Sequence, residues 1–289
     1  MLERMARPLR GVSDGIAAAM ESFYRALGGA GRLLQDFLNG VWLGHSLHAV
    51  LVDVVVGAST AALLLDVLRV LFGVEGLADA TFWVLGLAWL ASVGAVLTGL
   101  TDYKDTAPSS SERDVTALHG LINIVGAIGF GISTLQRATG SHDAAFWVLL
   151  VSYLVISVGA YIGGHVVYKY GYMVNHNAFS QGKRAKQFTP VVPAIDVPEE
   201  TPTKIMFGST AVMVVRRADV VYALKETCAH VGGPLSEGEL KGDTITCPWH
   251  FSTFRLSDGS AVHGPATSRQ VSYRARVNEG MIELQGPRD

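Results

Sequence analysis

Four long runs of apolar residues dominate the first 170 positions of the chain. They cover about residues 48–71, 81–101, 116–136 and 145–168, and each approaches the roughly 20 residues that a helix needs to cross a bilayer. Short polar turns separate the runs. We therefore expect a four-helix transmembrane domain at residues 45–170, arranged as an up-and-down bundle.

Residues 1–44 have a different pattern, in which apolar residues recur at helical spacing with charged residues between them. The apolar positions are Ile16, Met20, Phe23, Tyr24, Leu27, Leu33, Leu34, Phe37, Leu38 and Val41. This amphipathic N-terminal segment is expected to be helical. Two interpretations stay open: the segment lies on the membrane surface, or it packs on the protein itself.

The composition changes after residue 170. Residues 171–202 contain four prolines and a basic group, which is typical of an extended, semi-rigid linker. Short apolar stretches separated by turns follow in residues 203–289, and they predict a small antiparallel β domain. The strands are expected at 204–207, 211–216, 220–225, 244–247, 253–256, 271–277 and 281–285. The predicted fold class is an all-α membrane four-helix bundle followed by a small all-β domain.

Charge adds an orientation to this picture. The chain has 289 residues, only 17% of them charged, and a net charge of −2, with no basic patch that would indicate a nucleic-acid partner. One expected side of the membrane has only Arg69 and Arg137. The other side carries Arg4, Arg7, Arg10, Arg25, Arg32, Lys104, Arg113, Lys169, Lys183, Arg184 and Lys186. Because basic loops stay in the cytoplasm, we expect a multi-pass protein of the cell membrane with both termini and the β domain cytoplasmic.

The chemistry of the β domain is concentrated in two short motifs. They are Cys228-Ala229-His230 and Cys247-Pro248-Trp249-His250, and they contain the only two cysteines of the chain. Two thiolates and two imidazoles form the ligand set of a two-iron cluster that has histidines on one iron. The same four side chains could also hold a structural zinc ion.

The fuller motifs resemble the two cluster-binding loops of Rieske [2Fe-2S] proteins, because Gly232-Gly233-Pro234 follows the first motif and Pro248 lies in the second. The resemblance implies a [2Fe-2S] cluster bound by Cys228, His230, Cys247 and His250. High-potential members carry a disulfide at the positions of Gly233 and Trp249, and a tyrosine at that of Phe254. The chain therefore looks more like ferredoxin-type Rieske proteins, with a potential in the lower part of the family range.

Histidines also mark one end of the membrane domain. His45 and His48 open the first helix, His119 begins the third, and His165 lies near the end of the fourth. In an up-and-down bundle all four fall at the cytoplasmic face, with Asp102 at the same level. Three interpretations stay open: a b-type haem held by two of them, a quinone or proton-handling site, or interfacial side chains that only cap helix ends.

The opening Gly44-His45-Ser46-Leu47-His48 is similar to that of a family of four-helix bacterial membrane domains of unknown function, whose usual form is Gly-His-Pro-Leu-His-Pro. The resemblance covers approximately residues 40–170 and implies no activity. Asp66 and Arg69, near the far end of the first helix, are expected to form an i, i+3 ion pair.

Two functions follow as hypotheses. In the first, the protein passes single electrons between a cytoplasmic redox partner protein and a haem or quinone in the membrane. In the second, the β domain is a ferredoxin-type donor to a separate oxygenase or reductase, and the bundle is only an anchor. No catalytic residues are predicted, because about 85 residues leave no room for the mononuclear iron domain of an oxygenase. We expect a redox carrier or redox subunit rather than a stand-alone enzyme.

Overall fold

The computed structural model describes residues 1–179 and 185–288, which form two compact units. The first unit contains four long helices, and all four are long and apolar enough to cross a membrane. They are α4 (Leu47–Phe72), α5 (Leu77–Tyr103), α6 (Ser111–Ala138) and α7 (His142–Tyr170). The predicted membrane bundle is confirmed, and each helix extends a few residues beyond its apolar run.

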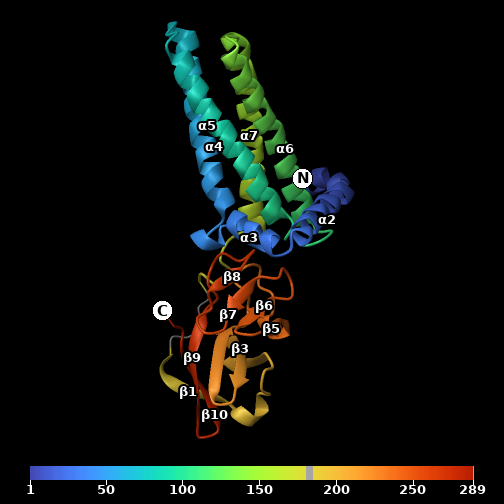
Figure 1. Ribbon diagram of the computed structural model, residues 1–289, viewed down its shortest axis with the longest axis vertical. Helices are drawn as coiled ribbons and strands as arrows, with labels where there is room; N and C mark the ends of the chain where they lie inside the picture. Colours follow the sequence, from blue (N-terminus) through green and yellow to red (C-terminus); the bar gives the residue numbers. More distant parts are fainter. Residues whose placement is uncertain (180–184, 289) are drawn as a thin grey trace. The chain divides into compact units, whose positions relative to one another are not determined.

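The four helices pair as two hairpins, α4 with α5 and α6 with α7 (Figure 1). Their shared core uses small residues such as Ala62 and Ala88 beside Leu85, Phe130 and Leu149, all of them fully buried. In a membrane, small side chains at helix contacts allow close backbone approach, which strengthens packing where water cannot drive it. Larger apolar side chains face outward along all four helices, as lipid contact requires.

A buried ion-pair cluster lies near the C-terminal ends of α4 and α6. Both guanidinium NH groups of Arg137 donate to the carboxylate of Asp66, one of them at 3.0 Å, and both side chains are fully buried. Arg69 lies 3.4 Å from the same carboxylate, which confirms the predicted i, i+3 pair, and also contacts the exposed Asp143 at 3.1 Å. The sequence did not indicate that Asp66 also joins α4 to α6.

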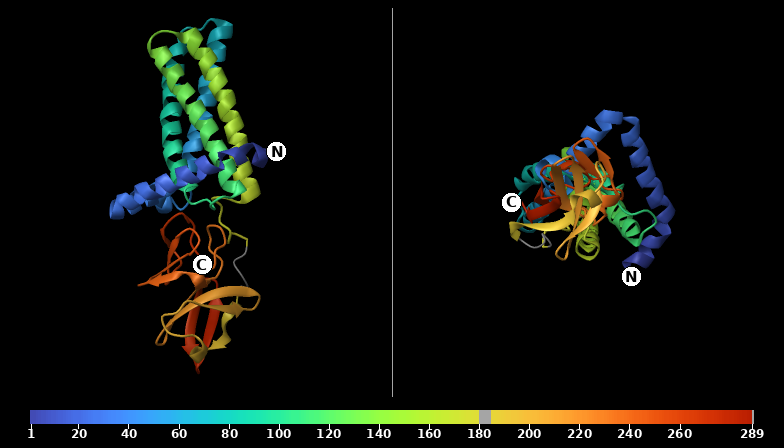
Figure 2. Two further views of the ribbon diagram at one scale, coloured as in Figure 1. Left: turned by 90° about the vertical axis from the view of Figure 1, so that its right-hand side faces the viewer. Right: turned by 90° about the horizontal axis from the view of Figure 1, so that it is seen from below.

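The N-terminal segment is helical and packs on the bundle. It comprises α1 (Leu2–Ala6), η1 (Arg7–Leu9), α2 (Arg10–Ala26) and α3 (Gly28–Asn39), with η2 (Val41–Leu43) after it. Helix α2 runs across the outside of the bundle (Figure 2). Arg10 pairs with Asp114 at 2.7 Å, and the Tyr24 hydroxyl lies 2.6 Å from that of Thr101. Of the two interpretations, packing on the protein is thus observed, while Leu33 and Phe37 remain exposed.

The second unit is an all-β domain with two antiparallel sheets. The first sheet has the strand order β1-β10-β9-β4-β3-β2 and the second β5-β6-β7-β8. The bounds are β1 Ala185–Pro193, β2 Thr203–Phe207, β3 Thr210–Arg217, β4 Val220–Lys225, β5 Glu239–Lys241, β6 Thr244–Thr246, β7 Thr253–Arg255, β8 Ala261–His263, β9 Ser272–Asn278 and β10 Met281–Gly286. Short 3-10 turns lie at Ala194–Asp196 (η3) and Leu235–Glu237 (η4).

The predicted linker at residues 171–202 is wrong over much of its length. Residues 185–193 form strand β1, which pairs with β10, so the β domain begins well before residue 203. β1 is an edge strand, where proline is tolerated because one side of the strand needs no hydrogen-bond donor. Pro190 and Pro193 were therefore wrongly interpreted as part of an extended linker. Lys183 and Arg184, counted above for orientation, lie outside the described residues.

We expect Asp66→Asn to destabilise the membrane domain strongly, because Arg137 would stay buried without a countercharge. Breaking a buried pair in this way costs about 3 to 5 kcal/mol. Thermal unfolding of the protein in mild detergent measures the effect as a lower midpoint. The matched control is Asp143→Asn, which removes the exposed carboxylate of the same cluster and is expected to change the midpoint little. Equal midpoints for the two variants would contradict the assignment.

Candidate metal centre

Two loops of the β domain carry the cysteine and histidine motifs. The first loop follows β4, and a pair of backbone hydrogen bonds closes it: the Cys228 N–H donates to the Gly233 carbonyl at 2.8 Å, and the Gly232 N–H donates to the Cys228 carbonyl at 3.0 Å. Gly232 has a φ of 85°, a left-handed conformation that glycine adopts without strain. The loop therefore turns back on itself around its cysteine.

The second loop joins β6 to β7 and repeats this geometry. The Cys247 N–H donates to the Ser252 carbonyl at 2.8 Å, and the Phe251 N–H donates to the Cys247 carbonyl at 3.1 Å. Phe251 occupies the position of Gly232 and also has a positive φ, of 62°. Two loops of different sequence thus present their cysteines in the same way.

The two thiols meet at the centre of the domain. Both cysteines are buried, and their sulfurs are hydrogen-bonded to each other. This hydrogen bond raises the pKa of Cys228 and lowers the pKa of Cys247 to about 7, while burial raises both. The N–H groups of His230 and Val231 donate to the Cys228 sulfur, and those of Trp249 and His250 donate to the Cys247 sulfur. The backbone N–H groups favour the thiolate, the form that binds metal, whereas burial opposes it.

The two imidazoles form a second pair. The ring centres of His230 and His250 are 5.1 Å apart with an interplanar angle of 83°. His230 is only 4% exposed, whereas His250 is half-buried. Each loop therefore contributes one member to a thiol pair and one to an imidazole pair.

The pairing favours a two-iron cluster over a zinc ion. A zinc ion needs all four ligands around one point, but no three His, Cys, Asp or Glu side chains in residues 1–179 and 185–288 are grouped to hold a single ion. A Rieske cluster instead takes two cysteines on one iron and two histidines on the other. Gly233 keeps the space beside Cys247 open, because a Cβ there would lie 2.7 Å from its sulfur. The residues present fit the cluster.

An apolar core surrounds the thiols. Leu235, Ile245 and Phe254 are fully buried in the same cluster of side chains as Cys228 and Cys247. The Ser252 hydroxyl, also fully buried, accepts a hydrogen bond from the Ala266 N–H at 3.0 Å. Water is thereby kept from the sulfur side of the site.

A residue that the sequence did not indicate holds the first loop in place. Gln270 is buried, and its amide nitrogen donates to the carbonyls of Lys225 and Thr227 at 2.5 and 2.6 Å. Its amide oxygen accepts from the Ala229 N–H at 2.9 Å and from the Asn177 side chain at 3.1 Å. An isolated glutamine in a polar loop carries no sequence signal for such a role.

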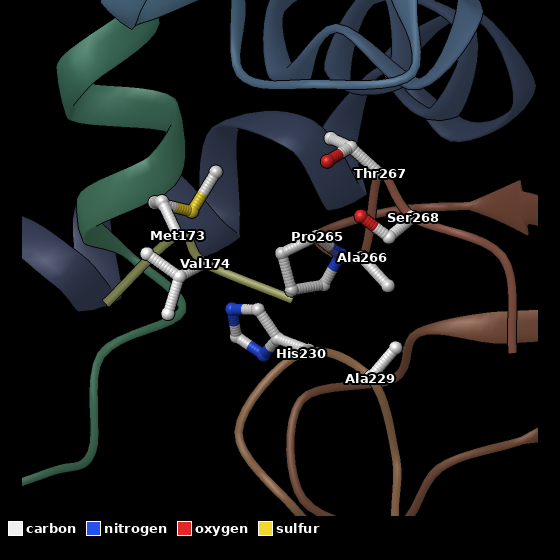
Figure 3. Close-up of a pocket in the computed structure, with 8 residues that line it drawn as sticks. All are labelled: Met173, Val174, Ala229, His230, Pro265, Ala266, Thr267 and Ser268. Atoms are coloured by element: carbon white, nitrogen blue, oxygen red, sulfur yellow. The ribbon is translucent and has the colours of Figure 1, made fainter. Parts of the chain in front are cut away.

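The segment after α7 folds onto the same loop. The His176 N–H donates to the Ala229 carbonyl at 3.0 Å, and the Tyr172 ring packs edge-on against His230 with centres 5.8 Å apart. Figure 3 shows the His230 imidazole in a small pocket between Met173 and Val174 on one side and Pro265 and Ala266 on the other. The first part of the predicted linker therefore packs over the His230 side chain.

These features define an iron–sulfur protein of the Rieske class. The profile of the Rieske [2Fe-2S] domain matches residues 187–274, and that of a predicted membrane protein family, DUF2231, matches residues 44–176. The chain belongs to the Rieske [2Fe-2S] family, and it joins a Rieske domain to a four-helix membrane domain. Both resemblances drawn from the sequence are confirmed.

The curated relatives are small Rieske ferredoxins. The domain is 35% identical to ferredoxin CarAc of Metapseudomonas resinovorans over 27% of this chain and 74% of that protein. It is 33% identical to the 3-phenylpropionate/cinnamic acid dioxygenase ferredoxin subunit of Escherichia coli K12, over 33% of this chain and 90% of the subunit. The solved ferredoxin of carbazole 1,9a-dioxygenase from Nocardioides aromaticivorans IC177 is 25% identical, over 35% of this chain and 98% of that one, with a TM-score of 0.33.

The four candidate histidines of the membrane domain do not converge as one group. His48 in α4 and His119 in α6 lie together, with ring centres 6.3 Å apart. His45 precedes α4 and is exposed. His165 packs on Tyr170, with ring centres 5.7 Å apart. Asp102 accepts a hydrogen bond from Ser46 at 3.1 Å, which places it level with the start of α4 as predicted.

Gln270→Ala is expected to loosen the first cluster loop, because it leaves the Ala229 N–H without its acceptor and removes one donor from each of the Lys225 and Thr227 carbonyls. The free energy of unfolding should fall by about 1 to 3 kcal/mol, the cost of one unmet buried group. Thermal loss of the visible absorbance of the cluster measures the change. Gln285→Ala removes one hydrogen bond, to the Lys186 carbonyl, and serves as the control. A Gln270→Ala protein as stable as this control would overturn the assignment.

Proposed function

We propose that this protein is a membrane-anchored Rieske electron carrier in which Cys228 and Cys247 bind one iron while His230 and His250 bind the other. The observation that carries the proposal is the pairing of like ligands, thiol with thiol and imidazole with imidazole. Thiolates stabilise ferric and ferrous iron, and neutral imidazoles place less negative charge on the second iron. When bound, the cluster supplies a one-electron couple.

The surrounding residues set the conditions for that couple. Four backbone N–H groups donate to the two cysteine sulfurs and offset negative charge there. Phe254 supplies no hydroxyl where high-potential relatives have one, so fewer hydrogen bonds stabilise the reduced state. We infer a potential in the lower part of the Rieske range of about −150 to +300 mV.

Electron exchange is inferred at the edge of His250 rather than at that of His230. His230 is 4% exposed and lies under Tyr172. His250 is half-buried, between Trp249 and Phe251, which are 53% and 63% exposed. His250 and its two exposed neighbours therefore form the edge of the site that we infer a redox partner contacts.

The first candidate role is electron transfer between a cytoplasmic partner protein and a haem or quinone of the membrane. The distribution of basic residues supports a cytoplasmic position for the Rieske domain and both termini. The two histidines that meet inside the bundle, His48 and His119, support a redox function for the membrane domain.

The second candidate role is that of a ferredoxin-type donor, with the bundle as an anchor. It is favoured by the relatives, because the Escherichia coli protein is named as the ferredoxin subunit of a dioxygenase. The two roles differ in one measurable respect. If the membrane is the electron acceptor, a soluble quinone analogue should speed reoxidation of the reduced full-length protein in detergent, and an unchanged rate would favour the donor role.

Each of Cys228→Ser, Cys247→Ser, His230→Ala and His250→Ala is expected to lose most of the iron and acid-labile sulfide. It should also lose the electron paramagnetic resonance signal of the reduced cluster. The wild type should contain two non-haem iron atoms and two acid-labile sulfides per chain. His263→Ala is the control, since His263 lies in β8 outside both motifs and should leave the cluster intact. One zinc ion per chain in place of iron would refute the proposal.

A further inference from the structure

In both hairpins of the membrane domain, a histidine of the first helix is hydrogen-bonded to a backbone carbonyl of the second helix. In the first hairpin, Nδ1 of His48 on α4 lies 2.8 Å from the Ala95 carbonyl of α5. In the second, Nδ1 of His119 on α6 lies 2.8 Å from the Gly159 carbonyl of α7. Each histidine stands near the start of the first helix of its hairpin, and each ring is held by the backbone of the second helix.

Glycine completes the arrangement one turn further along each second helix. Gly99 follows Ala95 by four residues, and a Cβ there would lie 3.0 Å from Cε1 of His48. Gly163 follows Gly159 by four residues, and a Cβ there would lie 2.7 Å from Cε1 of His119. Both rings therefore lie against a helix at a point where a side chain larger than glycine would crowd the imidazole.

The hydrogen bonds determine which nitrogen carries the proton. A carbonyl oxygen only accepts, so the Nδ1 of each neutral ring is protonated and the lone pair remains on Nε2. Metal-binding histidines characteristically donate the other ring N–H to a backbone carbonyl or carboxylate, which fixes the tautomer and the ring orientation. In the described residues the polar neighbours of both rings lie around Nδ1, and the Asn123 amide nitrogen near Nδ1 of His119 donates to the His119 carbonyl at 2.7 Å.

The two rings are spaced as a pair of ligands to one metal. Their centres are 6.3 Å apart with an interplanar angle of 80°. A metal–nitrogen bond of about 2.0 Å, together with the roughly 1.2 Å from ring centre to nitrogen, separates the centres of two opposed imidazole ligands by about 6.4 Å. The observed distance agrees with this value.

The ligand count points to haem rather than to a free ion. Zinc and similar ions need three or four protein ligands, and in the described residues no third His, Cys, Asp or Glu joins this pair. A porphyrin supplies four nitrogens itself, so its iron needs only two axial ligands from the protein. A proton relay would pair the rings with a carboxylate. The Nδ1–H of each ring instead donates to a backbone carbonyl, that of Ala95 for His48 and that of Gly159 for His119.

We propose that the membrane domain binds a b-type haem with His48 and His119 as the two axial ligands of its iron. We assign no iron-ligand role to His45, which is exposed, or to His165, which packs on Tyr170. The haem deepens the proposed function, because it is the membrane-side redox group that the first candidate role requires. The geometry of the site itself does not depend on that role.

The test uses the full-length protein, produced with the haem precursor δ-aminolaevulinate and purified in mild detergent. The reduced-minus-oxidised optical spectrum should show the sharp bands of a six-coordinate b-type haem. One haem per chain is expected by the pyridine haemochromogen assay. His48→Ala and His119→Ala should each lose at least tenfold in haem content, whereas His45→Ala and His165→Ala should retain it.

Two further measurements keep the outcome decisive. His119→Met retains a possible iron ligand and should keep haem with an altered spectrum, which separates loss of a ligand from loss of the fold. The paramagnetic signal of the reduced Rieske cluster should be unchanged in every variant. Wild-type protein that shows this signal but neither contains haem nor takes up added haemin would overturn the haem site and leave the proposed function standing. Full haem content in His48→Ala or His119→Ala would also overturn it.

Discussion

The burial of Cys228 and Cys247 in one apolar cluster, each presented by its own loop, is the constraint on which the cluster domain depends. Each thiol is presented by a loop that bends around its own cysteine through the same two backbone hydrogen bonds. Gly232 meets the required positive φ without strain, but Phe251 meets it at a cost of about 1 kcal/mol or more. That strain lies next to His250, at the accessible edge of the site. Strained residues of this kind concentrate where function requires a particular geometry.

The membrane domain also depends on a few buried polar contacts, but it forms them in a lipid bilayer. Two hairpins pack through small residues, and a carboxylate shared by two arginines joins α4 to α6 near one end. At the other end, His48 and His119 are positioned by carbonyls and glycines of their neighbouring helices. Polar groups in a bilayer are costly. In the described part of this bundle, one set joins the helices, and the other is the pair of histidines that we propose as haem ligands.

Much of this organisation could be predicted from the sequence, because its causes are local. Membrane helices follow from apolar length alone, and Rieske loops follow from cysteine, histidine, glycine and proline at fixed spacing. Features that depend on distant partners could not be predicted. Asp66 and Arg137 are 71 residues apart, and Gln270 acts on carbonyls more than 40 residues away.

The most direct test of the central claim is pulsed electron paramagnetic resonance of the reduced full-length protein, grown once with natural histidine and once with ¹⁵N-labelled histidine. If His230 and His250 both bind iron, the spectrum of the reduced cluster should show nitrogen couplings from two histidines, and both should change on labelling. A spectrum that labelling leaves unchanged would mean that no histidine binds the cluster. The Rieske assignment of the four ligands would then be wrong.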